Sequence, residues 1–278
     1  MRIGLFPFCT DYSMPIDKLA IAEEERGFDS IWVPEHTHIP ASRMTDYPGG
    51  GALPKEYSHT LDPFVALGMA AAVTTELKLG TGICIAVEHH TLTLAKTVAT
   101  LDHVSNGRVL LGLGGGWNRE EMENHGVDYG GRFKKLEEQM QALEQIWTQE
   151  RASFQGRYEQ FDEVWSWPKP VQAPHPPIYL GGASDHTLRR IVRYAQGWLP
   201  ITTDADAIIR KMTKLDQLAA ADGRDPDSIA VSIFAAPPRD ELVAQFRETR
   251  VERIIFQVPP RSEADTLRRL DRYARWIS

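Results

Sequence analysis

The sequence predicts an α/β barrel built from eight strand–helix units, the (β/α)8 or TIM barrel, and three observations predict it. Short apolar segments alternate with longer amphipathic segments along the whole chain of 278 residues. Strands that alternate with helices pair in parallel and are joined by right-handed crossovers. A length near 250 residues is usual for eight such units closed into one barrel. We therefore expect a single barrel domain over residues 1–278.

The expected elements follow one another in strict alternation. The eight expected strands are 3–8, 29–33, 78–83, 108–113, 178–181, 197–199, 229–234 and 253–256. The expected helices are 15–26, 63–74, 91–105, 132–148, 184–195, 205–221, 240–249 and 263–277. Asp62 is typical of a residue that caps a helix start, and Gly27 is typical of one that ends a helix.

Three segments interrupt the alternation as insertions. Residues 34–60 follow the second strand, and residues 120–131 follow the fourth. Residues 154–177 precede the fifth strand. They begin with an aromatic hairpin at 154–167, with its turn near Gly156, and continue as a proline-rich extended stretch. Loops that follow strands carry the chemistry of such barrels, so the first two insertions are expected beside the active site.

Composition excludes several classes of protein. The hydrophobic share of 42%, with 21 glycines beside it, is that of a globular chain, not a disordered one. A formal charge of −7 argues against a nucleic-acid binder. No apolar run is long enough to span a membrane, and the apolar N-terminus is too short for a signal peptide. Two cysteines, Cys9 and Cys84, are expected to be buried free thiols. We expect a cytoplasmic protein.

Four motifs follow predicted strands, and the barrel rule therefore places them on one face. They are Glu35-His36-Thr37-His38, Glu88-His89-His90, Gly112-Leu113-Gly114-Gly115-Gly116-Trp117 and Gly181-Gly182-Ala183-Ser184. The last motif has the clearest physical explanation. Its glycines let the backbone approach a ligand, and Ser184 begins a helix whose free N–H groups favour an anion such as phosphate. An ordinary capped strand–helix turn explains the same residues.

The glycine run at 112–116 lacks the G-x-G-x-x-G spacing of a dinucleotide-binding fold, so we reject that interpretation. Consecutive glycines after a strand indicate either that something flat lies on the backbone or that the loop is flexible. Only Trp117, among the tryptophans, directly follows such a run.

The histidines allow two kinds of chemistry. Imidazole titrates near working pH, which favours His36 as a general acid or base. A metal site that uses His36 and His38, with His89 or His90, is the alternative, and it would make the chain a barrel metal hydrolase. Apart from Glu35 and Glu88, no carboxylate or cysteine stands at a strand end with them, so no metal is predicted.

Stretches along most of the chain resemble the luciferase-like monooxygenase superfamily, in its branch that uses the deazaflavin coenzyme F420. The matching stretches include Gly27 to His36, Asp62 to Leu67, Leu79 to Ile83, Asn106 to Trp117, Lys169 to Gln172, Pro176 to Ser184 and Gly197 to Pro200. The resemblance implies a barrel with a flavin-type ring in its mouth.

The resemblance also implies roles for residues. A cis non-prolyl peptide at Gly82-Ile83 forms a bulge behind the ring, and Gly114, Gly115, Gly116 and Trp117 line the other side. The cofactor phosphate lies at Gly181, Gly182, Ala183 and Ser184. His36 lies near the reactive carbon of the ring as acid or base, and Glu35 orients it or balances its charge.

Two departures from the family pattern bear on the cofactor. FMN enzymes of the superfamily often carry an arginine where this chain has Gly115, which favours F420. Many F420 enzymes have Asp-His where this chain has Glu35-His36. We therefore expect hydride transfer between C5 of F420 and a small organic substrate, in a homodimer. An FMN-dependent two-component monooxygenase is the first alternative, and a non-catalytic cofactor carrier is another.

Overall fold

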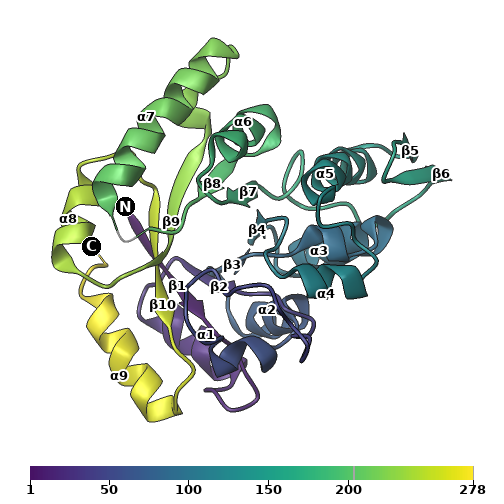
Figure 1. The fold of residues 1–278 in the computed structure, drawn as a ribbon. Helices are drawn as coiled ribbons and strands as arrows, with labels where there is room; N and C mark the ends of the chain where they lie inside the picture. The colour runs from purple at the N-terminus through teal and green to yellow at the C-terminus, as the bar shows by residue number, and fades with distance from the viewer. Residues whose placement is uncertain (203, 278) are drawn as a thin grey trace.

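The computed structural model describes residues 1–202 and 204–277, and it confirms the predicted barrel. Parallel strands close in the order β1-β10-β9-β8-β7-β4-β3-β2 (Figure 1). The barrel strands are β1 (Arg2–Pro7), β2 (Ser30–Val33), β3 (Lys78–Thr81), β4 (Val109–Leu113), β7 (Ile178–Gly181), β8 (Gly197–Leu199), β9 (Ala230–Ala236) and β10 (Arg253–Val258). Each corresponds to one expected strand, with ends that differ by a few residues.

The helices lie outside the strands, as Figure 1 shows. They are α1 (Ile16–Glu25), α2 (Pro63–Val73), α3 (Thr91–Val104), α4 (Arg119–Asn124), α5 (Arg132–Thr148), α6 (Asp185–Tyr194), α7 (Ala205–Ala221), α8 (Asp240–Arg247) and α9 (Glu263–Ala274). Helix α4 was not expected, because its stretch was assigned to a loop. Within the described residues, no helix has both the length and the apolar character needed to cross a bilayer.

The insertion before β7 contains the expected hairpin. Strands β5 (Ala152–Gln155) and β6 (Gln160–Val164) pair antiparallel in a separate two-stranded sheet. The N–H of Gly156 donates to the carbonyl of Glu159 at 2.9 Å, so the turn covers 156–159. The hairpin lies beyond α5, away from the barrel strands (Figure 1).

Close packing between β3 and β4 requires a glycine at position 112. A Cβ there would lie 2.0 Å from the carbonyl oxygen of Thr81. That oxygen belongs to the backbone and cannot move aside without disturbing the sheet. Gly112 therefore serves the sheet itself, whereas the glycines after it stand beyond the strand end.

At the end of the barrel where the strands begin, a buried ion pair joins β10 to the residue that precedes β2. Arg253, at the start of β10, donates to Asp29 at 2.5 Å and to Ser232 of β9 at 3.0 Å. Asp29 directly precedes β2. This end therefore contains a charge that is paired and hydrogen-bonded, as a buried charge requires.

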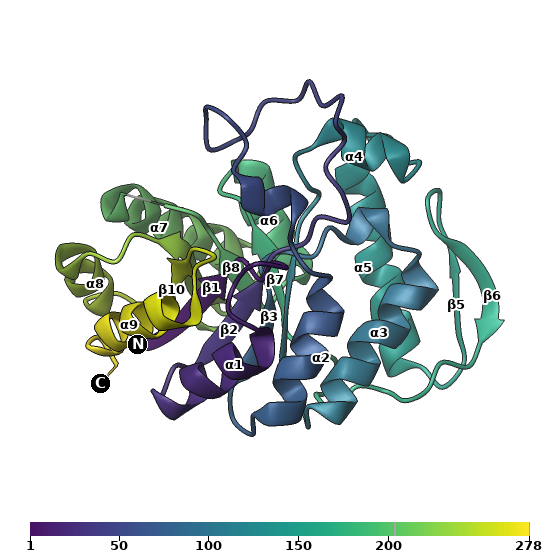
Figure 2. The ribbon, with the colours of Figure 1, turned by 90° about the horizontal axis from the view of Figure 1, so that it is seen from below.

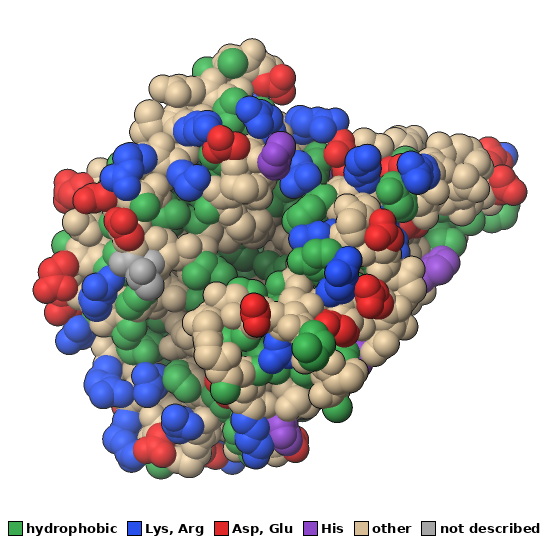
Figure 3. Space-filling model, viewed as in Figure 1, with side chains coloured by type: hydrophobic (Ala, Val, Ile, Leu, Met, Phe, Trp, Pro, Cys, Tyr) green, Lys and Arg blue, Asp and Glu red, His purple; other side chains and the backbone are tan. Residues whose placement is uncertain are grey.

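The carboxyl ends of the strands form a hollowed face. In Figure 3 the centre of this face is sunken and lined mainly by hydrophobic side chains. Figure 2 shows the long loop between β2 and α2 arching over this end of the barrel, with α4 beside it. We call this hollow the mouth.

Candidate functional site at the barrel mouth

His36, Trp117 and Tyr57 converge at the mouth from three segments. His36 follows β2, Trp117 follows β4, and Tyr57 lies in a short 3-10 helix, η1 (Lys55–Ser58). The His36 ring centroid lies 5.3 Å from that of Tyr57 and 5.8 Å from that of Trp117. Two predicted site residues, far apart in sequence, are thus neighbours in the fold.

Glu121 of α4 holds the ring of His36. His36 Nδ1 lies 2.7 Å from Glu121 Oε2, and the Glu121 side chain is fully buried. A carboxylate only accepts hydrogen bonds, so Nδ1 carries the proton in this pair. Nε2 of His36 bonds to no described residue and is the atom that can exchange a proton with a ligand.

Glu35 makes its hydrogen bonds elsewhere. One of its oxygens accepts from the backbone N–H of Ile85 at 2.5 Å, and the other pairs with His89 Nε2 at 2.8 Å. Successive side chains at the end of a strand point to opposite sides, which separates Glu35 from the His36 ring. The sequence led us to expect a contact between Glu35 and His36, but in the structure Glu121 makes that contact with His36.

The contact with Glu35 raises the pKa of His89. Burial lowers the pKa of His89, but the hydrogen bond and the charge of Glu35 outweigh burial, so the pKa is raised above 6.5. The pair fixes the short 3-10 helix η2 (Ala86–Glu88) against the end of β2. Glu35 therefore supports the site from below.

The Gly82–Ile83 peptide bond is cis, as the resemblance implied. Ile83, which follows β3, lies near glycine positions at the ends of the next two strands of the barrel, β4 and β7. A Cβ at Gly114 would lie 2.3 Å from Ile83 Cδ1, and one at Gly181 would lie 3.6 Å from Ile83 Cγ2. The structure thus brings together predicted cofactor residues from three strand ends, and Gly114 leaves the space that the Ile83 side chain fills.

Beyond Gly114, the glycine run lies against an aromatic ring, and two arginines stack on the same ring. A Cβ at Gly115 would lie 2.9 Å from Phe133 Cε1. The guanidinium carbons of Arg132 and Arg190 each lie 4.5 Å from the centroid of the Phe133 ring. Within the described ranges, neither arginine pairs with a carboxylate. In Figure 3 blue Lys and Arg side chains gather over α5 and α6, beside the hollow.

Gly181 to Ser184 form the turn between β7 and α6. Gly182 has φ +95°, which glycine adopts without strain. Ser184 caps α6 by accepting from the Thr187 N–H at 3.1 Å. The carbonyl of Gly182 accepts from Trp198 Nε1 at 2.7 Å. Ala183 is partly buried against the core. The geometry matches both an ordinary capped turn and an anion site, as the sequence alone did.

The loop between β2 and α2 covers this region with aromatic side chains. Tyr47 bonds to Tyr57 through their hydroxyls at 3.2 Å, and the Arg43 guanidinium lies 5.7 Å from the Trp117 ring centroid. Glu120 anchors the loop by accepting from Thr45 Oγ1 at 2.7 Å and from the Met44 N–H at 2.9 Å. These bonds lower the pKa of Glu120 to about 2.

The histidines do not form the metal set that the sequence offered as an alternative. His36 bonds to Glu121, whereas His38 bonds to Thr37 and Asn124 at 2.9 Å each. Among the residues that the structure describes, the ligand-type atoms that do cluster belong to Glu35, Cys84 and His89, within 4.8 Å of one another. Hydrogen bonds already engage both oxygens of Glu35 there, so we assign this cluster a structural role. His90 directly precedes α3 and is exposed.

Sequence reasoning missed Glu121, Tyr57 and Tyr47. A signal for Glu121 was present: Asn118 followed by acidic residues is typical of a helix start after the glycine run. No comparable signal marked the tyrosines, because their loop has no periodic pattern and only the fold returns it to the mouth.

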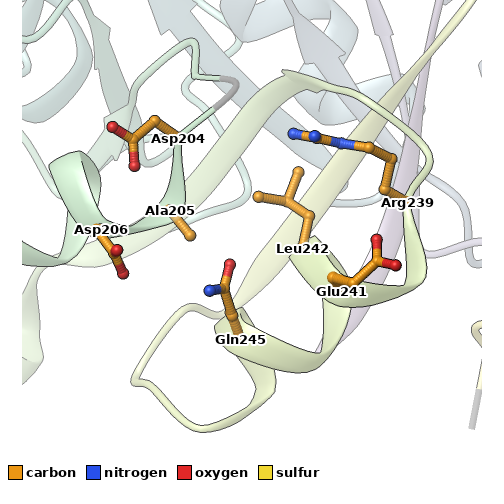
Figure 4. Close-up of a pocket in the computed structure, with 7 residues that line it drawn as sticks. All are labelled: Asp204, Ala205, Asp206, Arg239, Glu241, Leu242 and Gln245. Carbon is orange, nitrogen blue, oxygen red and sulfur yellow. The ribbon is translucent and has the colours of Figure 1, made fainter.

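A separate pocket of about 230 Å³ lies between the starts of α7 and α8 (Figure 4). Its lining is mostly polar or charged: Asp204, Ala205, Asp206, Arg239, Glu241, Leu242 and Gln245. None of the predicted site residues lines it. It lies across the barrel from β2, and it lacks the aromatic side chains of the mouth.

Comparison with known proteins identifies the family. The sequence pattern of the luciferase-like monooxygenase family matches residues 15–274. The chain belongs to this family. The structure is also similar to that of the monooxygenase RslO1 from Streptomyces bottropensis, with a TM-score of 0.80 and 20% identity over 100% of this chain and 98% of that one.

The relatives use two different cofactors. An uncharacterized protein of Mycobacterium tuberculosis is 42% identical over 99% of this chain and 98% of its own length. The F420-dependent hydroxymycolic acid dehydrogenase of the same species is 28% identical over 81% of this chain and 60% of its own. The FMNH2-dependent dimethylsulfone monooxygenase of Pseudomonas putida is 31% identical over 46% of this chain and 36% of its own. The chain is therefore an oxidoreductase or monooxygenase of a family with F420-dependent and FMN-dependent members.

Proposed function

We propose that the protein is an F420-dependent oxidoreductase that transfers a hydride between the deazaflavin and a small organic substrate. The observation that carries the proposal is the His36 ring, held through Nδ1 by Glu121, with Nε2 left for a ligand beside Trp117 and Tyr57. When bound, F420 accepts or donates a hydride at C5, which is redox chemistry that amino-acid side chains lack.

The residues of the mouth fit such a ring. The centre of the face is hollowed and hydrophobic (Figure 3), and Gly114 and Gly181 keep the space around Ile83 clear. In the proposal, Gly82, Ile83, Gly116 and Trp117 bound the ring. The N–H groups at the start of α6, next to Gly182 and Ser184, would hold the phosphate.

His36 would hold or release a proton at Nε2, next to the substrate atom that gains or loses the hydride. Glu121 orients the ring, and Tyr47, Tyr57 and Arg43 shape the wall above it. The loop that carries these three residues would exclude water from the reaction. Phe133 occupies the space beside Gly115, and a glycine at this position cannot reach the phosphate as the arginine of FMN enzymes does. In the proposal, Arg190 supplies that charge from α6 instead.

Binding of each cofactor to the purified protein tests the proposal. We expect saturable F420 binding at least about tenfold tighter than FMN binding, measured by equilibrium dialysis. Arg190→Gln should weaken it, whereas Arg189→Gln, on the exposed neighbouring position, should leave it nearly unchanged. Tight FMN binding with none for F420 would instead support the two-component monooxygenase. Tight binding without turnover on any hydride donor or acceptor would support a carrier.

We also propose that the protein is a homodimer that pairs through α2. This helix contains no charged residue, yet Val65 is 67% exposed and Met69 is 47% exposed. Together with Val73 they lie four residues apart, in one line along the helix. A helix that is apolar all round is normally covered, and an exposed apolar stripe marks an interface.

Sedimentation of variants tests the dimer. Met69→Asp with Val65→Asp should convert a dimer to a folded monomer. Met44→Asp is the control, because Met44 is 84% exposed on the loop at the mouth. A wild-type protein that is monomeric at every accessible concentration would refute the proposal.

A cytoplasmic location also stays a proposal, supported by two buried cysteines that are free thiols.

A further inference from the structure

A carboxyl group without a partner lies buried behind the candidate site. The side chain of Glu88 is 1% exposed, and neither of its oxygens has a hydrogen-bond partner among the described residues. Glu88 ends η2, directly before His89. An ionised carboxylate in such a position is costly, because nothing replaces the water that it loses.

Titratable groups face Glu88 from three segments. Glu35, which follows β2, and Glu121 of α4 bring negative charge, and Lys135 of α5 brings positive charge. His125 Nε2 lies 3.7 Å from Glu88 Oε2, beyond hydrogen-bond distance. Lys135 donates its own hydrogen bond to the Val87 carbonyl at 2.7 Å. Two other carboxyls therefore lie near Glu88, and no donor reaches it.

Hydrogen bonds decide which of the three carboxyls carries a proton, because donors favour the ionised form. Glu35 accepts from Ile85 and His89. Glu121 accepts from His36 at 2.7 Å and from Asn118 at 3.4 Å. Glu88 accepts none. Burial, then the charges of Glu121 and Glu35, raise the pKa of Glu88 to about 9, although Lys135 opposes them.

We propose that Glu88 is a neutral carboxylic acid in the resting protein and acts as a positioning residue for His36 through Glu121. While Glu88 is neutral, Glu121 is the carboxylate that bonds to His36 Nδ1, and no third negative charge competes for a proton. When Glu88 ionises at alkaline pH, a new buried negative charge stands near Glu121, and it changes the electrostatic surroundings of the Glu121–His36 hydrogen bond. The catalytic meaning of this role rests on the proposed function of His36.

Infrared spectroscopy of the cofactor-free protein tests the protonation of Glu88. At neutral pH the wild type should show the carbonyl stretch of a protonated carboxylic acid. The band should lose intensity in Glu88→Gln, where the second buried carboxyl, Glu23 of α1, still contributes. It should be unchanged in Glu123→Gln, the same change at an exposed position of α4. A wild type without the band, or a Glu88→Gln variant that keeps its full intensity, would overturn the proposal.

Nuclear magnetic resonance tests the link to His36, and its first measurement uses the wild-type protein alone. In wild-type protein labelled at the glutamate carboxyl carbon, one carboxyl should titrate near pH 9, and the ring nitrogens of His36 should shift with it. In Glu88→Gln the alkaline shift of His36 should disappear. A wild-type His36 that shows no alkaline transition would refute the positioning role. Neither measurement uses a cofactor, so failure to bind F420 leaves this result standing.

Discussion

At the scale of single residues, the mouth contains two histidine–carboxylate pairs that cross the order of the sequence. Glu35 and His36 are adjacent in the chain, but Glu35 bonds to His89 and His36 bonds to Glu121. The first pair is structural, because it fixes η2 below the mouth. The second leaves Nε2 of His36 without a hydrogen bond to any described residue. Adjacent residues thus acquire different roles from the direction of their side chains alone.

His36→Asn should separate chemistry from binding. Asparagine keeps a polar group but cannot exchange a proton near neutral pH, so we expect kcat to fall by about 10²–10⁴. Affinity for F420 should change little. Oxidation of reduced F420, followed by absorbance with ketones as hydride acceptors, gives the rates. His38→Asn, two residues along, is the control and should stay near the wild-type rate. Equal losses in both variants would argue against a proton-exchanging His36.

At the scale of elements, the short helix α4 organises the mouth. Glu120 and Glu121 are neighbours on it, and each holds a different part of the mouth. The first accepts hydrogen bonds from the covering loop, and the second holds His36. The strands below require close approach, which Gly112 provides. The short segment from β4 to α4 therefore contributes both to the packing of the sheet and to the mouth.

Gly112→Ala should destabilise the barrel strongly. The new Cβ would overlap the Thr81 carbonyl oxygen, and overpacking of this kind costs about 1–3 kcal/mol or more. Gly181→Ala, on β7, is the matched control, because its Cβ would meet neighbours at 3.6 Å or farther. Urea denaturation gives the free energy of unfolding of each. Similar losses in the two variants would contradict the steric argument.

At the scale of the whole molecule, charge is buried at both ends of the barrel, but in different states. Arg253 and Asp29 form a closed ion pair at one end, and Asp29 holds the pKa of Arg253 above its ordinary value despite burial. At the mouth, Glu88 has no hydrogen-bond partner among the described residues, and Glu35 raises the pKa of His89. Groups at the mouth therefore titrate between mild acid and mild alkali, and so does Glu23 of α1, a second buried carboxyl whose pKa burial raises.

Stability should fall as pH rises across this window. The folded protein keeps a proton on Glu88 up to about pH 9, whereas the unfolded chain releases it near 4.5. Between these values the unfolded chain binds fewer protons, so the free energy of unfolding falls with pH, by at most about 1.4 kcal/mol per pH unit from this group. His89 acts in the same direction, because its raised pKa stabilises the folded state below its ordinary value and the gain is lost above its folded value.

Urea denaturation at a series of pH values measures this slope. Glu88→Gln cannot ionise and should have a shallower slope than the wild type, whatever its stability at one pH, while Glu23 still contributes to both curves. Glu123→Gln should run parallel to the wild type. A Glu88→Gln curve as steep as that of the wild type would show that Glu88 is ionised in the folded protein.

The sequence by itself determined the barrel, its strand and helix order, and the face on which the motifs gather. Those features depend on local periodicity, capping and the parallel pairing that alternation imposes, and each is readable within a short window. It also marked His36, Trp117 and the glycine turns, because polar residues and glycines stand out after buried strands.

Only the tertiary structure decided which groups touch. It paired His36 with Glu121 across 85 positions, returned Tyr47 and Tyr57 to the mouth, and left Glu88 buried without a donor. The physical reason is that hydrogen bonds and charge interactions depend on distances in space. Those distances are set by how eight strands close and how one loop folds back over them, and no window of the sequence contains that information.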